Sequence, residues 1–281
     1  MVVNVSKSPV AGAADAAIPK LGLGTWELRG QPCAEIVAQA LRLGYTHIDT
    51  AQGYDNEEAV GEGLSASGVA RDDVFVTTKV QPQLIGDGDL QRSVEASLER
   101  LGVDRVDLLL LHWPNPSIPL ADSVRALNQV KREGLARHIG LSNFPSAMLR
   151  EAWRLTTEPL AAQQIEYHPY LDQTTMLAAL RQHGMAIIAF CPIALGQVVS
   201  DPVIQAIAAA HGRSAAQVTL RWLTQQPDVI AIPRTSRAER LAENLDVFDF
   251  ALSDGEMQRM SSLTRPRSRL IDHPEWVAEW D

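Results

Sequence analysis

Eight short runs of β-branched residues or leucine, each followed by a longer amphipathic stretch, most limit what this chain can fold into. Strands and helices that alternate in this way build a parallel sheet. Eight such units favour a sheet that closes on itself, a (β/α)8 TIM barrel. The predicted strands are Leu21–Gly24, Thr46–Asp49, Val74–Lys79, Val106–His112, Arg137–Ser142, Ala162–Glu166, Ala186–Phe190 and Val229–Pro233.

Helices are predicted where apolar residues recur every three or four positions. The pattern is clearest in Leu90, Val94, Leu98 and Leu101. Similar spacing predicts helices over Ser123–Glu133, Met148–Leu155, Met176–His183 and Val218–Leu223. Five glycines fall just past predicted helix ends, where a left-handed residue is favoured; they are Gly44, Gly68, Gly102, Gly134 and Gly184.

The length of 281 residues suits one barrel domain, since such barrels span roughly 200–400 residues. No linker rich in Pro, Ser or Gly divides the chain, so we expect a single domain over residues 1–281. Residues 1–20 should lie at the barrel bottom, and the tail over residues 264–281 near the active-site mouth. The stretch Met1–Ala17 is rich in Ala and Val, but Pro9, Gly12 and Asp15 interrupt it, which argues against a signal peptide.

The net charge of −9 disfavours a nucleic-acid partner, which a basic surface would bind. No run approaches the ~20 apolar residues of a membrane span. Cys33 and Cys191 lie far apart and form no CxxC pair, so we expect neither a disulfide framework nor a metal site. The sequence thus predicts a soluble, cytoplasmic protein, and no heptad pattern calls for a partner, so we expect a monomer.

Polar side chains with chemical capability stand at the predicted ends of successive strands. Asp49, Lys79 and His112 end the second, third and fourth strands, Ser142 ends the fifth, and Gln164 lies near the end of the sixth. The carboxyl ends of barrel strands carry the loops that form active sites. We therefore expect these side chains to meet on one face of the barrel.

Tyr54 lies in the loop after Asp49, where a phenol would face the barrel mouth. A tyrosine pKa near ~10 makes it a slow acid or base unless a neighbour stabilises the phenolate. Lys79 can supply that charge, and Asp49 can keep a buried Lys79 protonated. His112 can hydrogen-bond a carbonyl oxygen or pass a proton.

Each of these residues also has a simpler interpretation. Asp49 and Lys79 could form a core ion pair, and His112 could be a buried histidine with satisfied hydrogen bonds. Their placement at successive strand ends favours catalysis. Asp55 or Asn56, by contrast, is expected only to cap the following helix.

Seven motifs along the chain are typical of one enzyme family: Leu21–Trp26, Asp49–Glu57, Thr77–Lys79, Leu111–Pro114, Gly140–Phe144, Gln164–Pro169 and Ile232–Thr235. Through them the sequence resembles the aldo-keto reductase family over almost its whole length. The resemblance implies a (β/α)8 barrel that uses NADPH without a Rossmann domain, with Asp49, Tyr54, Lys79 and His112 as its catalytic tetrad. Hydride would pass to a carbonyl carbon while Tyr54 protonates the oxygen and His112 orients the substrate.

The resemblance also implies the cofactor contacts. Arg234, Thr235 and Arg240 match residues that hold the adenosine 2′-phosphate, which favours NADPH (NADP+) over NADH; a solvated basic surface is the alternative. Ser142, Asn143 and Gln164 match residues that hold the nicotinamide amide. The other implied cofactor contacts are Asn244 near the adenine, Phe190 against the nicotinamide ring, and Gly24, Thr25 and Trp26.

The chain departs from the family pattern at Gln163, at Phe190 and at Cys191, which is interpreted as a packing residue. The loop over Leu195–Asp201 is short, which suggests loose cofactor clamping. Trp26 and Trp113 should form apolar walls for the substrate beside Tyr54 and His112. The alternative for both tryptophans is packing in the core.

Within the family, the sequence resembles bacterial 2,5-diketo-D-gluconate reductases, which implies small-molecule carbonyl substrates such as diketo acids and methylglyoxal. Arg269 would then meet a substrate carboxylate or form a surface salt bridge. Two alternatives stay open. One is a broad detoxifying reductase of bulky ketones or toxins, and the other a non-catalytic subunit that senses NADPH.

Overall fold

A closed parallel sheet forms the centre of the molecule. The computed structural model describes residues 10–13, 16–277 and 279–281. The sheet order is β10-β9-β8-β7-β6-β5-β4-β3, and bridges from Leu21 to Ala231 and from Gly24 to Arg234 close it. The strands are β3 (Leu23–Gly24), β4 (His47–Asp49), β5 (Phe75–Val80), β6 (Val106–Leu111), β7 (Ala136–Ser142), β8 (Leu160–Glu166), β9 (Ala186–Phe190) and β10 (Val229–Ala231).

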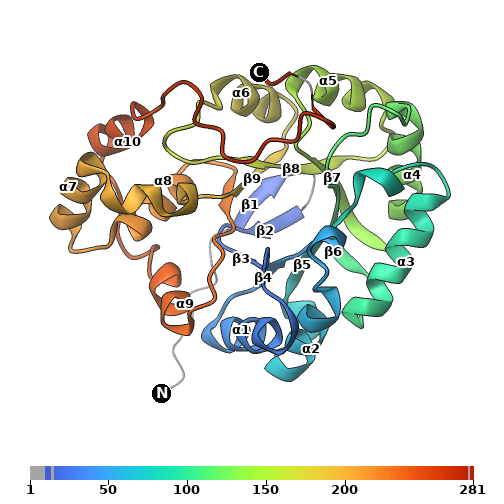
Figure 1. The fold of residues 1–281 in the computed structure, drawn as a ribbon, viewed down its shortest axis with the longest axis horizontal. Coiled ribbons are helices and arrows are strands. Elements are labelled where there is room, and N and C mark those ends of the chain that lie inside the picture. Colours follow the sequence, from blue (N-terminus) through green and yellow to red (C-terminus); the bar gives the residue numbers. More distant parts are fainter. Residues whose placement is uncertain (1–9, 14–15, 278) are drawn as a thin grey trace.

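Helices surround this barrel (Figure 1). The α-helices are α1 (Gly30–Leu43), α2 (Glu57–Ser67), α3 (Asp89–Leu101), α4 (Leu120–Arg132), α5 (Ser146–Leu155), α6 (Thr174–Gln182), α7 (Pro202–His211), α8 (Ala215–Gln225), α9 (Ala238–Leu245) and α10 (Asp254–Ser261). Short 3-10 turns are η1 (Gln52–Tyr54), η2 (Arg71–Asp73), η3 (Pro82–Leu84) and η4 (Ala194–Ser200).

The predicted TIM barrel is therefore confirmed, and each predicted strand coincides with an observed one to within two residues at each end. The five glycines expected after helix ends all have positive φ values, as a left-handed residue requires. The loop after β9 contains the turn η4, in which Leu195 and Gly196 are left-handed. Within the described residues, no helix is long and apolar enough to cross a membrane.

Side chains alternate across the strands and so build two layers of core. Along β6, Leu108 and Leu110 point into the barrel, whereas Leu109 and Leu111 pack in the layer that faces the helices. This alternation follows from the period of two in a strand. The barrel interior is a packed core that includes a few buried polar side chains, such as His47 and Thr77, which contact each other.

An antiparallel hairpin of β1 (Val10–Ala13) and β2 (Ala16–Pro19) precedes the barrel. Ile18 packs with interior residues such as Leu110 and Ile230, and Figure 1 shows the hairpin across the centre of the ring. Met1–Ala17 is the stretch in which the sequence argues against a signal peptide. Of these residues, 1–9 and 14–15 lie outside the described part of the chain.

Closure of the barrel depends on a glycine. A Cβ atom at Gly24 would stand 2.8 Å from the carbonyl oxygen of Ile232, closer than real Cβ contacts allow. The amide of Gly24 donates to Pro233, across the seam. Gly24 therefore has a structural reason to be glycine, whatever contact it makes with a ligand.

Candidate active site

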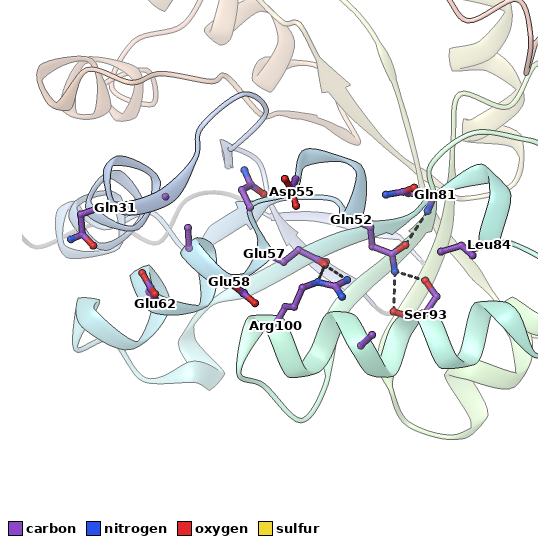
Figure 2. Close-up of a pocket in the computed structure, with 14 residues that line it drawn as sticks. Gln31, Gln52, Asp55, Glu57, Glu58, Glu62, Gln81, Leu84, Ser93 and Arg100 are labelled. Carbon is purple, nitrogen blue, oxygen red and sulfur yellow. Dashed lines mark hydrogen bonds and ion pairs between the residues drawn. The ribbon is translucent and has the colours of Figure 1, made fainter.

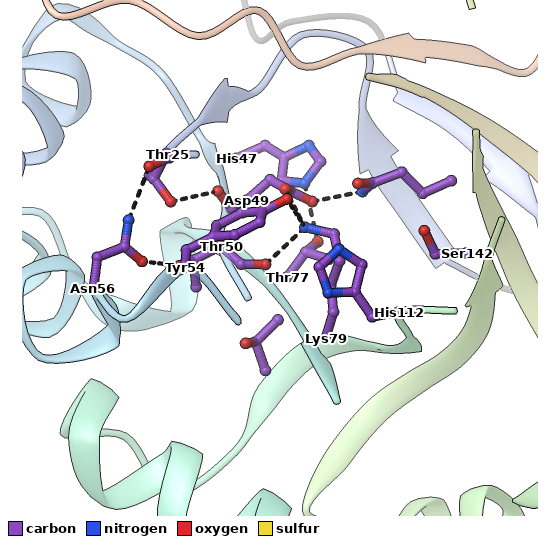
Figure 3. A network of polar contacts seen from close by, with 12 residues as sticks. Thr25, His47, Asp49, Thr50, Tyr54, Asn56, Thr77, Lys79, His112 and Ser142 are labelled. Atoms are coloured by element: carbon purple, nitrogen blue, oxygen red, sulfur yellow. Dashed lines mark hydrogen bonds and ion pairs between the residues drawn. The ribbon is translucent and has the colours of Figure 1, made fainter. Parts of the chain in front are cut away.

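The ends of β4, β5 and β6 bring the predicted catalytic side chains together. Asp49 is the last residue of β4, Lys79 lies in β5, and His112 directly follows β6. Tyr54 ends the turn η1 between β4 and α2. Figure 3 shows these side chains converging at one end of the barrel.

The ammonium group of Lys79 is fully buried and uses all three of its N–H bonds. It lies 2.6 Å from Oδ1 of Asp49, 2.8 Å from the carbonyl oxygen of Thr50 and 3.2 Å from the hydroxyl of Tyr54. Burial alone would lower the pKa of Lys79, but Asp49 and Tyr54 more than offset it and raise the pKa. Lys79 therefore remains a charged ammonium.

Burial raises the pKa of Tyr54 above its ordinary value of 10.0, and the charge of Lys79 opposes this rise. The lysine thus acts in the expected direction, but burial is the larger effect. The phenol stays protonated at neutral pH. It can give up its proton to a group that becomes strongly basic, and the adjacent ammonium would stabilise the phenolate that remains.

His112 faces Tyr54 with its ring edge on, and the ring centroids are 5.7 Å apart. Burial, and then the charge of Lys79, hold the pKa of His112 well below its ordinary value of 6.5. The imidazole is therefore neutral and can donate one hydrogen bond to an oxygen atom. This favours the orienting role over that of a cation.

The second oxygen of Asp49 is also engaged, because Gln164 donates to Oδ2 from Nε2 over 2.7 Å. The hydroxyl of Thr25 donates to the backbone carbonyl of Asp49. Both the side chain and the backbone of Asp49 are thus fixed by neighbouring strands and loops. The carboxylate position is set before any ligand arrives.

The expectation that Asp55 or Asn56 caps α2 with its side chain is wrong. Asn56 occupies the N-cap position without a capping bond. Its amide instead donates to the carbonyl oxygens of Thr25 and Leu28, and its oxygen accepts from Thr50. The side chain ties the loop after β3 to the loop after β4, which holds the wall of the site in place.

A pocket of about 540 Å³ opens over this network. Its lining includes the predicted substrate walls Trp26 and Trp113, and Trp26 is 40% exposed while Trp113 is buried. Two residues of the tail, Ile271 and His273, also line it. Neither tail residue was singled out in the sequence, because a lone residue in a loop carries no periodic signal.

Some predicted cofactor residues line the pocket and others do not. Those that line it are Gly24, Trp26, Asn143, Gln164, Phe190, Arg234 and Arg240. Those that do not are Thr25, Ser142, Thr235 and Asn244, which are all buried. The hydroxyl of Ser142 accepts from Asn143, and that of Thr235 bonds the backbone of Arg237.

The residues in this pocket suit a nicotinamide dinucleotide. Oδ1 of Asn143 is buried and has no hydrogen-bond partner among the described residues, so it can accept from a carboxamide. The left-handed backbone of Asn143, with φ at 63°, aims the side chain toward His112 and Ser142. Two exposed guanidiniums, Arg234 and Arg240, can bind phosphate elsewhere along the pocket.

A second hollow of about 720 Å³ lies outside the barrel between α1, α2 and α3 (Figure 2). Its buried carboxylate, Glu57, accepts from Thr78 and from Arg100. Gln52 donates to Ser93. These polar groups bind one another, so we assign no chemistry to this hollow despite its size.

The structure also gives the surroundings of Arg269 and Cys191. Arg269 lies over the ring of Trp280, with its guanidinium carbon 3.6 Å from the ring centroid, and does not line the pocket. Cys191 does line it, but burial raises the pKa of its thiol to about 12. A protonated thiol is a poor nucleophile, which agrees with a packing role.

The chain resembles known proteins in sequence and in structure. The model of the Aldo/keto reductase family matches residues 20–265. Morphine 6-dehydrogenase of Pseudomonas putida is 44% identical and is covered over 88% of each chain. A crystal structure provisionally assigned as 2,5-diketo-D-gluconic acid reductase B is 45% identical, with TM-score 0.96 and 98% of each chain covered. The Bombyx mori aldo-keto reductase in complex with NADP is 29% identical, with TM-score 0.89 and 98% of each chain covered.

Proposed function

The chain belongs to the aldo/keto reductase family, and we propose that it reduces small aldehydes and ketones to alcohols with NADPH. The observation that carries this proposal is the buried contact of Lys79 with both Asp49 and Tyr54, beside a neutral His112 at one pocket. This arrangement suits the transfer of one proton to a carbonyl oxygen.

When bound, NADPH supplies the hydride that reduces the carbonyl carbon. Asn143, Gln164 and Phe190 would hold the nicotinamide end, while Arg234 and Arg240 would bind phosphate. The complex of the Bombyx mori relative with NADP supports this choice of cofactor. The two guanidiniums favour a dinucleotide that carries an additional phosphate.

The protein residues supply the proton and the orientation. His112 donates a hydrogen bond to the substrate carbonyl and turns it toward Tyr54. Tyr54 transfers its hydroxyl proton to that oxygen as the carbonyl carbon is reduced. Lys79, which Asp49 keeps charged, stabilises the resulting phenolate until solvent returns the proton.

For the substrate, we propose small dicarbonyl compounds and keto-sugar acids such as 2,5-diketo-D-gluconate and methylglyoxal. The support is the 45% identity to the provisional 2,5-diketo-D-gluconic acid reductase B. A second candidate is a bulky polycyclic ketone, which the 44% identity to morphine 6-dehydrogenase favours. Specificity constants for both substrate classes distinguish the two.

The test is NADPH oxidation across a panel of carbonyl compounds by the wild type and by Tyr54→Phe. The variant keeps the ring but loses the proton, so we expect turnover to fall by about 100-fold or more. NADPH binding, followed by fluorescence, should change little. Tyr167→Phe is a matched control, because that hydroxyl bonds Gln226 and does not line the pocket. A Tyr54→Phe enzyme that retains most of its turnover rules out the proton-donor role.

A further inference from the structure

We propose that His273 is a second histidine of the active site and that it binds a carboxylate group of the substrate. This inference rests on the proposed reductase function. Within the proposed substrates, it favours the carbonyl compounds that also carry a carboxylate, such as the keto-sugar acids. Residues 264–281, the tail, contribute His273, and Figure 1 shows the tail in dark red where it crosses from α10 toward α5.

The tail is fixed to the barrel by a buried carboxylate. Glu166, at the end of β8, is fully buried and accepts from the backbone amides of Leu270 and Ile271 over 2.7 and 2.8 Å. Oε1 of Glu166 also lies 2.9 Å from Nε2 of His168. His273 follows this anchored pair by two residues, so its position is set by the barrel itself.

The tail is held again on the other side of His273. Asp281 accepts from the amide and the hydroxyl of Ser146, at the start of α5. Between the two attachments, the amides of Trp276 and Val277 both donate to the carbonyl of His273 over 2.9 Å. His273 therefore lies in a compact turn rather than in a free end.

The imidazole of His273 is oriented by two neighbours. Its Nδ1 lies 2.9 Å from Oε1 of Glu275, and a carboxylate only accepts, so Nδ1 carries the proton. The ring packs edge on against Trp113, with centroids 4.8 Å apart. The side chain is 45% exposed and lines the pocket, which leaves Nε2 for a ligand.

Among the basic side chains at or near the pocket, His273 is the one best placed for a substrate carboxylate. Arg234 and Arg240 follow the last strand and are assigned to the cofactor. His112 is held neutral, and the ammonium of Lys79 has no free N–H bond. Arg269 stacks on Trp280 and does not line the pocket.

Two acidic residues of the tail flank His273. Glu275 bonds it directly, and Asp272 precedes it on the same segment and accepts from Trp280. His112, which directly follows β6, is a basic group nearby. An imidazole that donates from Nδ1 to one carboxylate can carry a second proton on Nε2, and the imidazolium then donates to another carboxylate.

The experiment compares 3- and 4-formylbenzoate with their methyl esters, which have the same aldehyde and nearly the same shape. The readout is the ratio of kcat/KM for acid over ester in the wild type, His273→Gln and His183→Gln. His183 stacks on Trp153 and does not line the pocket, so its variant is the matched control. NADPH binding checks that each variant is folded.

We expect the wild type to prefer the acid of one isomer over its ester, through a lower KM for the acid. His273→Gln should reduce that ratio about tenfold, whereas His183→Gln keeps it. A His273→Gln enzyme with the wild-type ratio overturns the inference and leaves the reductase function standing. A wild-type enzyme that reduces neither acids nor esters, nor any other carbonyl, refutes the proposed function instead.

Discussion

Gln164 donates a hydrogen bond from Nε2 to Oδ2 of Asp49 over 2.7 Å. The other oxygen of that carboxylate contacts Lys79. A side chain on β8 thus helps to position an ion pair between β4 and β5, across the mouth of the barrel. The contact links a residue expected to hold the nicotinamide with the charge that keeps Lys79 protonated.

Replacing Gln164 with Leu should leave a buried carboxylate oxygen without a partner, which costs about 1–3 kcal/mol of unfolding free energy. We also expect a lower kcat, because Asp49 is freer to move away from Lys79. Gln163→Leu is the control, since the amide of Gln163 donates to Phe144. Urea unfolding and NADPH turnover of the two variants test this. An unchanged kcat in Gln164→Leu contradicts the positioning role.

Lys79→Met should lower the free energy of unfolding more than the loss of a surface lysine would. Removing one partner of a buried ion pair costs about 3–5 kcal/mol, because the other charge stays buried and unpaired. Adding Asp49→Asn removes that charge, so the double variant should recover part of the stability but no activity. The free energy of unfolding of both single variants and the double variant measures this coupling. Additive losses would argue against a coupled pair.

The stability of the protein should fall as the pH drops below neutral. Burial lowers the pKa of His47 from 6.5 to about 4 in the folded protein. Between these values the unfolded chain binds a proton that the folded protein does not, so unfolding becomes more favourable as the pH falls. The full effect is about 3 kcal/mol, present above pH 6.5 and lost on the way down to about pH 4.

Urea unfolding at several pH values in this window tests the role of His47. The variant His47→Gln can keep a polar contact with Thr77, the partner of Nε2, but it does not titrate. Its unfolding free energy should therefore depend less on pH than that of the wild type. A His47→Gln slope equal to that of the wild type would assign the effect to other groups.

Arg240→Ala and Arg234→Ala should weaken NADPH binding by about tenfold each and NADH binding much less, since a charge-assisted phosphate contact is lost. Arg237→Ala is the control, because Arg237 is exposed on the same segment but does not line the pocket. Fluorescence titration with both dinucleotides measures the difference. Equal losses for NADPH and NADH would remove the 2′-phosphate assignment.

The strands of the barrel could be predicted because parallel strands buried on both faces are continuous apolar runs, such as Leu108–Leu111. The hairpin of β1 and β2 was missed for the opposite reason. Its residues are mostly Ala, Gly and Pro, which carry little strand preference. Contact with the barrel interior, and not local preference, fixes its position.

The site was predictable where its residues stand at strand ends, since the barrel brings those ends together. It was not predictable where loops meet. Asn56 follows the usual pattern of a helix cap, but carbonyl oxygens from the loop after β3 take its amide. His273 depends on the attachment of the tail to Glu166, a contact between residues about a hundred positions apart.

The raised pKa of Lys79 also affects whether its amine can react with an aldehyde. A neutral amine condenses with aldehydes to form an imine, whereas a protonated ammonium does not. Asp49, Thr50 and Tyr54 hold all three protons of Lys79. Lys79 is therefore protected from imine formation with the aldehydes that the site is proposed to reduce.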